Sequence, residues 1–220
     1  MSHRSRPHRA EPVLSALVAA VTFLAWAAGV SFAVPAAAHD AVSTYLFVPN
    51  RDSADVAVID TRTDTLVARV PVGRVPHQVV VSTRTDRLVA SNTADNTITI
   101  VDLHALRPVA TLALDTEPEH MELSPDGTLL AVGNIGAGTV SLVALPEGRE
   151  RARVSGLIEP HNLTFSRDGT RLFVANLGGD HVSVIDVAAG RVVEEIRWPR
   201  RPRWRLPRRQ AMPNIRASST

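Results

Sequence analysis

The chain has 220 residues, of which 45% are hydrophobic, so it can form a packed core and is not a wholly disordered polypeptide. It contains no cysteine, which excludes disulfides, thiolate metal sites and cysteine nucleophiles. It contains no lysine either, because all 24 basic side chains are arginine, and this excludes Schiff-base chemistry and the lysine of a phosphate-binding loop.

The net charge of +2 conceals three differently charged parts of the chain. A basic leader is followed by an acidic body, residues 39–196, in which 13 arginines face 21 acidic residues. The last part, residues 197–220, has 8 arginines and no acidic residue. Net charge is therefore a poor guide to what the protein binds, and each part needs its own interpretation.

Residues 1–38 have the pattern of a secretory signal peptide. Three arginines before position 10 are followed by an uncharged stretch, and its apolar residues 13–34 lead to a proline and three alanines. A basic start, an apolar segment and a small-residue site predict cleavage after Ala38 and a location outside the cytoplasm, in the periplasm or secreted. The alternative is an uncleaved anchor, since the apolar run is long enough to span a bilayer.

The body of the chain, from Tyr45 to about Trp198, repeats every 42 residues. Four asparagines have this spacing: Asn50, Asn92, Asn134 and Asn176. The same spacing separates three prolines: Pro76, Pro118 and Pro160. Repetition at this length is the signature of a propeller or a solenoid.

Each full copy is predicted to hold four short strands. In the last copy they are His161–Ser166, Leu172–Asn176, His181–Asp186 and Arg191–Ile196. Apolar residues alternate with small or polar ones in these segments, which is typical of half-buried strands, and an Asp-Gly pair supplies the tight turn after the first strand. About 40 residues and four antiparallel strands per repeat indicate one blade of an all-β propeller.

Leu172-Phe-Val-Ala-Asn176 followed by Val182-Ser-Val-Ile-Asp186 resembles the YVTN β-propeller repeat. The segment Val70–His77 is similar to the linker that this family uses between blades. The resemblance implies a partial YVTN propeller over residues 39–198. Such propellers occur in secreted and surface-layer binding proteins, gluconolactonase-like enzymes, quinoprotein amine dehydrogenase subunits, haem-domain nitrite reductases and nitrous-oxide reductase.

The propeller is expected to be incomplete. Its first unit begins at Tyr45 with what is the second strand of the other units, so the chain encodes about 3.5–4 blades in an open or incomplete ring. The arginine- and proline-rich residues 199–220 do not have the alternation of a further strand and are expected to be a disordered tail. A truncated gene product explains both features. The alternatives are a short native form that associates with another chain, and a four-bladed ring.

Three histidines are the candidate metal ligands: His77, His120 and His161. His77 and His161 directly follow repeat prolines, while His120 lies one residue later in its copy. Residues that open the innermost strands lie near the mouth of a propeller channel, where several imidazoles can bind copper or haem iron. The simpler interpretation is that each histidine packs against a neighbouring blade, and the shifted position of His120 argues against convergence.

Two further residue sets are interpreted as structural. The repeated asparagines close the second strand of each unit and are expected to bond their own backbone in a tight turn. A set of acidic residues lies in and beside the linkers between units: Asp115, Glu117, Glu119, Glu122 and Glu159. These carboxylates are a possible calcium site of the lactonase type, but a solvated acidic face is the expected outcome.

These observations favour a binding or scaffolding module without catalytic residues, and no cofactor is predicted. The expected partner is another protein, or a second copy through the open blade edges. The arginine- and tryptophan-rich tail is not expected to bind nucleic acid, and membrane contact is expected only if the leader is uncleaved. The alternative is a fragment of a propeller enzyme, either a lactonase-like hydrolase or a redox propeller related to the last three families named above.

Overall fold

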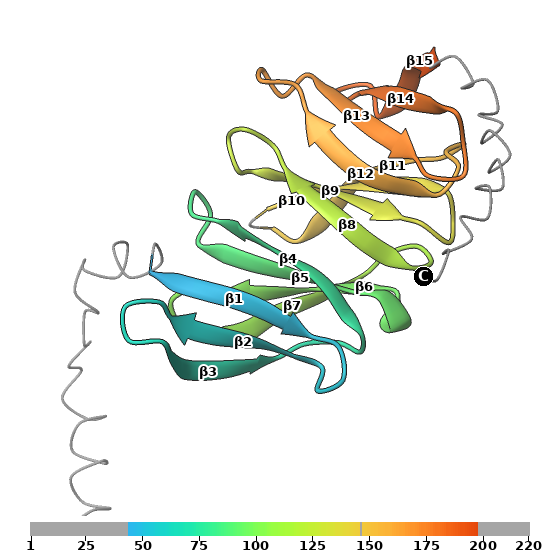
Figure 1. Ribbon diagram of the computed structural model, residues 1–220. Coiled ribbons are helices and arrows are strands. Elements are labelled where there is room, and N and C mark those ends of the chain that lie inside the picture. The colour runs from blue at the N-terminus through green and yellow to red at the C-terminus, as the bar shows by residue number, and fades with distance from the viewer. Residues whose placement is uncertain (1–43, 146, 198–220) are drawn as a thin grey trace, which may run out of the picture. The chain divides into compact units, whose positions relative to one another are not determined.

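A computed structural model describes residues 44–145 and 147–197 (Figure 1). They belong to the second of the two units into which the chain divides, Ala41–Thr220. The predicted signal peptide, residues 1–38, and the predicted tail, residues 199–220, lie outside the described residues. Within the described part of the chain, no helix has both the length and the apolar character needed to cross a membrane.

The described residues form four antiparallel sheets (Figure 1). The first sheet has three strands: β1 (Tyr45–Asn50), β2 (Asp55–Asp60) and β3 (Thr65–Pro71). The second has four: β4 (Pro76–Ser82), β5 (Arg87–Asn92), β6 (Thr97–Asp102) and β7 (Arg107–Ala113), with a 3-10 turn η1 (Thr93–Asp95). The third has β8 (Pro118–Leu123), β9 (Leu129–Asn134), β10 (Thr139–Ala144) and β11 (Arg149–Val154). The fourth has β12 (Pro160–Phe165), β13 (Arg171–Asn176), β14 (His181–Asp186) and β15 (Arg191–Arg197).

The predicted all-β fold of four-stranded blades is confirmed. Strands pair in chain order in every sheet, and β1 takes the position that β5, β9 and β13 take in the sheets after it. Within residues 44–145 and 147–197, the first sheet lacks the strand that begins the other three, as the sequence indicates. The 42-residue register therefore predicts the strand ends to within about one residue, because each turn recurs at the same place in the repeat.

Three hydrophobic clusters lie between consecutive sheets. Val58 and Leu88 lie at the centre of the cluster between the first and second sheets. Ile100 and Leu130 are central between the second and third sheets. Leu142 and Leu172 are central between the third and fourth. Among the described residues no such cluster combines the first sheet with the fourth. The sheets are therefore an open series in which each interface joins neighbours in sequence.

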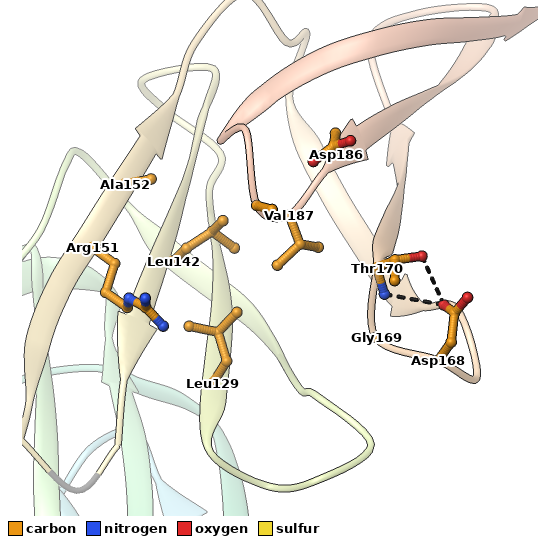
Figure 2. Close-up of a pocket in the computed structure, with 10 residues that line it drawn as sticks. Leu129, Leu142, Arg151, Ala152, Asp168, Gly169, Thr170, Asp186 and Val187 are labelled. Atoms are coloured by element: carbon orange, nitrogen blue, oxygen red, sulfur yellow. Dashed lines mark hydrogen bonds between the residues drawn. The ribbon is translucent and has the colours of Figure 1, made fainter.

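Aspartates organise the turns that follow the first strands. In the fourth sheet Ser166 Oγ donates a hydrogen bond to Asp168 Oδ1 at 2.6 Å. Thr170 N and Thr170 Oγ1 donate to the same oxygen at 3.0 and 2.8 Å (Figure 2). Gly169 has a φ of 71°, which suits glycine far better than other residues. These donors lower the pKa of Asp168 to about 2.

This turn should lose its contribution to stability in acid. Because the pKa of Asp168 is lower in the folded than in the unfolded chain, its bonds stabilise the fold above about pH 4 and are lost as the pH falls through 2. NMR titration of the Asp168 carboxyl carbon should give a midpoint near 2. Between pH 5 and 2 the unfolding temperature of Asp168→Asn should depend less on pH than that of the wild type. An ordinary titration midpoint near 4 would contradict the hydrogen bonds described.

Candidate metal centre

The innermost strands of the last three sheets begin with the same irregularity. β4, β8 and β12 each start with a proline that pairs with the asparagine closing the next strand, and pairing resumes only at the fourth residue, Val79, Met121 or Leu163. The two residues after each proline are thus left out of the ladder. Such a bulge re-aims side chains that regular alternation would fix, and all three candidate histidines lie in these bulges.

The structure brings the three histidines together. The ring centroids of His77 and His120 are 5.1 Å apart, and those of His120 and His161 are 3.9 Å apart. The Nε2 atoms of His120 and His161 are 3.0 Å apart, within hydrogen-bonding distance. Imidazoles from the second, third and fourth sheets therefore lie against one another. Each ring does contact a neighbouring blade, as the simpler interpretation expects, but the expectation that the shifted position of His120 prevents convergence is wrong.

The shifted position of His120 is what allows the convergence. It occupies the repeat position of Gln78, whose Oε1 accepts a hydrogen bond from Met121 N in the next sheet, at 2.5 Å. A side chain at this position reaches from one sheet to the following one, and His120 accordingly reaches His161. Sequence spacing counts residues along the chain, so it does not reveal toward which neighbour a bulge residue points.

The surroundings of these rings favour neutral imidazoles with a nitrogen lone pair available to a ligand. His161 Nδ1 lies 3.2 Å from Asn162 Oδ1, and a proton on Nδ1 donated to that oxygen leaves His161 Nε2 as an acceptor. Burial, with the nearby His161 and His77, lowers the pKa of His120, which favours its neutral form. The Nδ1 atom of His77 is buried and has no hydrogen-bond partner among the described residues.

One carboxylate of the acidic set joins the histidines. His77, Glu119 and His120 each place a potential ligand atom so that these atoms lie within 4.8 Å of one another. Within the described ranges this is the one group of such side chains close enough to hold a metal ion, and it includes none of the other acidic linker residues. Asp115, for example, is paired with Arg153 at 3.4 Å. Within the described ranges the five acidic side chains of the linkers therefore do not come together as one group. We call His77, Glu119, His120 and His161 the histidine cluster.

Apart from the histidine cluster, a hollow opens between the third and fourth sheets, beside the turns that follow the first strands (Figure 2). Its volume is about 610 Å³. Arg151 and Leu129 lie on one side, and Asp168, Asp186 and Val187 lie on the other. Asp168 is already bound within its own turn, and Asp186 accepts a hydrogen bond from Ala189 N. The hollow thus combines apolar side chains with charges of both signs and does not favour one class of ligand.

Comparisons with known proteins identify the fold. Residues 43–145, less than half of the chain, match the family model of the cytochrome D1 heme domain. Hydrazine synthase from Kuenenia stuttgartiensis has a similar structure, with a TM-score of 0.65 and 23% sequence identity over 70% of this chain and 46% of that one. The chain thus spans less than half the length of that protein. No curated protein matches the sequence. Together these findings show a β-propeller repeat protein.

The histidine cluster does not fit a haem, the group that the matching family's description implies. An axial ligand needs open space in front of its nitrogen for the flat macrocycle. His120 and His161 instead direct their Nε2 atoms at each other, and their rings are in contact. His161 also lies outside the matching residues 43–145. The donor set, three imidazoles and one carboxylate, is the kind that binds a bare transition-metal ion.

Proposed function

We propose that this chain is the propeller part of an extracytoplasmic redox protein, with its redox centre at the histidine cluster. One observation carries the proposal: side chains from three successive repeats converge at the start of the innermost strands. The side chains of the cluster are half-buried, and groups of titratable side chains with shifted pKa values are common at functional sites. The match to a heme-domain model supports the redox class, although haem itself does not fit the cluster.

Two finer assignments accompany this proposal. The signal-peptide pattern of residues 1–38 supports an extracytoplasmic location, where the lack of cysteine is no disadvantage. The Leu172–Asn176 and Val182–Asp186 motifs support a repeat of the YVTN type. In this role the histidine cluster would hold a metal ion, and that ion would supply one-electron transfer between an external donor and an external acceptor.

The second candidate function is the non-catalytic binding module. The hollow between the third and fourth sheets favours it, since a partly apolar pocket of about 610 Å³ is large enough for a small molecule. The two candidates differ in whether the purified protein exchanges electrons.

The proposal is tested with the full chain exported by a bacterial host grown with added copper and iron. We expect the protein to take up about one electron per chain from dithionite and to return it to ferricyanide, with an absorbance or EPR change. His120→Ala should abolish this exchange. His104→Ala, which removes a histidine from the turn between β6 and β7, should retain it. A folded wild-type protein without electron exchange would reject the redox function in favour of the binding module.

A further inference from the structure

We propose that the histidine cluster binds one divalent first-row transition-metal ion directly. This inference rests on the proposed function insofar as it places the ion at the same residues. It specifies what the centre is: an ion held by protein side chains rather than an iron held in a macrocycle.

The distances leave an ion-sized position between the side chains. Nitrogen ligands bind such ions at about 2.0–2.1 Å, so two ligands of one tetrahedral ion are about 3.4 Å apart. The Nε2 atoms of His120 and His161 are 3.0 Å apart, a few tenths of an ångström less. The ligand atoms of His77, Glu119 and His120 lie within 4.8 Å of one another, which is at most about 1.4 Å more than that separation. His161 contacts His120 but is not part of that group of three, so an ion bonded to all four side chains requires side-chain rotations within the bulges.

The present bonding of the cluster is incomplete without an ion. The contact between the two Nε2 atoms accommodates one hydrogen, carried by His120 when His161 bears its own on Nδ1. For an ion to bond both nitrogens, that proton moves to Nδ1 of His120, so both imidazoles stay neutral. The buried Nδ1 of His77 has no partner among the described residues. A buried polar atom without a partner destabilises the fold, and a metal bond is one way to satisfy it.

The outer contacts also fit a metal site. His161 Nδ1 lies 3.2 Å from Asn162 Oδ1, which orients the ring so that Nε2 faces the cluster. Metal-bound histidines commonly donate their second N–H to an oxygen in this way. Because the three imidazoles come from β4, β8 and β12, one bound ion also links the second, third and fourth sheets.

The charge and the ligand types narrow the choice of ion. One carboxylate and three neutral imidazoles suit Cu²⁺ or Zn²⁺, whereas Ca²⁺ and Mg²⁺ prefer oxygen ligands. Among divalent ions of this row, Cu²⁺ generally binds nitrogen ligands most tightly. We therefore expect Cu²⁺ to bind more tightly than Zn²⁺, and neither Ca²⁺ nor Mg²⁺ to compete.

The test uses the full chain, stripped of metal with a chelator and titrated separately with Cu²⁺ and Zn²⁺ by calorimetry. Loss of an outer contact commonly weakens metal binding about 10–100-fold, so removal of a ligand in His120→Ala should weaken it by more than about 100-fold. His161→Ala is a second ligand variant, should His120→Ala fail to fold. Asn162→Ala should weaken binding by about 10-fold. His104→Ala should bind as wild type does, and the chain's remaining histidines are common to every variant.

EPR of the Cu²⁺ form gives a second readout, because nitrogen splitting should decrease when His161 is replaced by alanine. Equal affinity of wild type and His120→Ala, or unchanged splitting, would overturn the proposal. If an ion is bound at the cluster but never changes its oxidation state, the redox function fails and this inference stands. If electrons are exchanged by protein without a stoichiometric ion, the inference fails and the redox function stands.

Discussion

Leu130→Ala should destabilise the protein by about 2–5 kcal/mol, whereas Leu46→Ala should cost less than about 1 kcal/mol. The two leucines occupy the same repeat position, 84 residues apart. Leu130 is fully buried between the second and third sheets, but Leu46, on the first sheet, is 50% exposed. Removing a buried leucine loses apolar burial and leaves a cavity, while removing a half-exposed one loses only part of its burial.

Leu88 and Leu172 complete the series at this repeat position and provide the controls. Both are buried, with exposed fractions of 2% and 0%, so both alanine variants should lose nearly as much stability as Leu130→Ala. Denaturant unfolding of the four variants measures the difference. Equal losses at Leu46 and Leu130 would mean that the first sheet is covered by something other than the described residues.

The fold follows from the sequence because the repeat is regular. The spacing of the asparagines and prolines fixes where each strand and turn recurs. In the same register, the first described sheet begins at Tyr45 with the second strand of the repeat. One detail of the alternation differs from expectation. The small polar residues in the third strand of each full sheet are not solvated, since Thr99, Ser141 and Ser183 are 3%, 0% and 2% exposed.

The candidate site was only partly predictable. The sequence identifies His77, His120 and His161, but their convergence depends on bulges that a period does not reveal. Glu119 was missed as a partner of the histidines because it resembled the other acidic residues of the linkers. The signal that distinguishes it is its place directly after Pro118, the repeat position at which His77 and His161 lie in the other sheets.

The repeated asparagines form hydrogen bonds with the buried hydroxyl groups of the third strands. These residues close β1, β5, β9 and β13, and their side chains reach beyond the local turn that the sequence suggests. In the fourth sheet Asn176 Nδ2 donates to Ser183 Oγ at 2.9 Å. In the third, Asn134 Nδ2 donates to Ser141 Oγ and Thr139 Oγ1, both at 3.0 Å. Each of these two asparagines therefore ties the second strand of its sheet to the third.

The two asparagines differ in their carbonyl oxygens. Asn176 Oδ1 accepts a hydrogen bond from Ile158 N, in the linker that enters the fourth sheet, at 2.9 Å. Asn134 Oδ1 is buried and has no partner in the described part of the chain. The equivalent linker amide, Thr116 N, donates instead to Asp115 Oδ1 at 3.1 Å. Asn176 thus fastens a linker to its sheet, whereas Asn134 does not.

Asn176→Ala should therefore cost about 2–4 kcal/mol, and Asn134→Ala about 1–2 kcal/mol. Both variants lose the bonds to the third strand. Only Asn176→Ala also leaves the amide of Ile158 without its acceptor, whereas Asn134→Ala removes an oxygen that already lacks a partner. Denaturant unfolding gives the two free energies, and hydrogen exchange at Ile158 should accelerate in Asn176→Ala alone. A larger loss in Asn134→Ala would show that the linker bond contributes less than the bonds within the sheet.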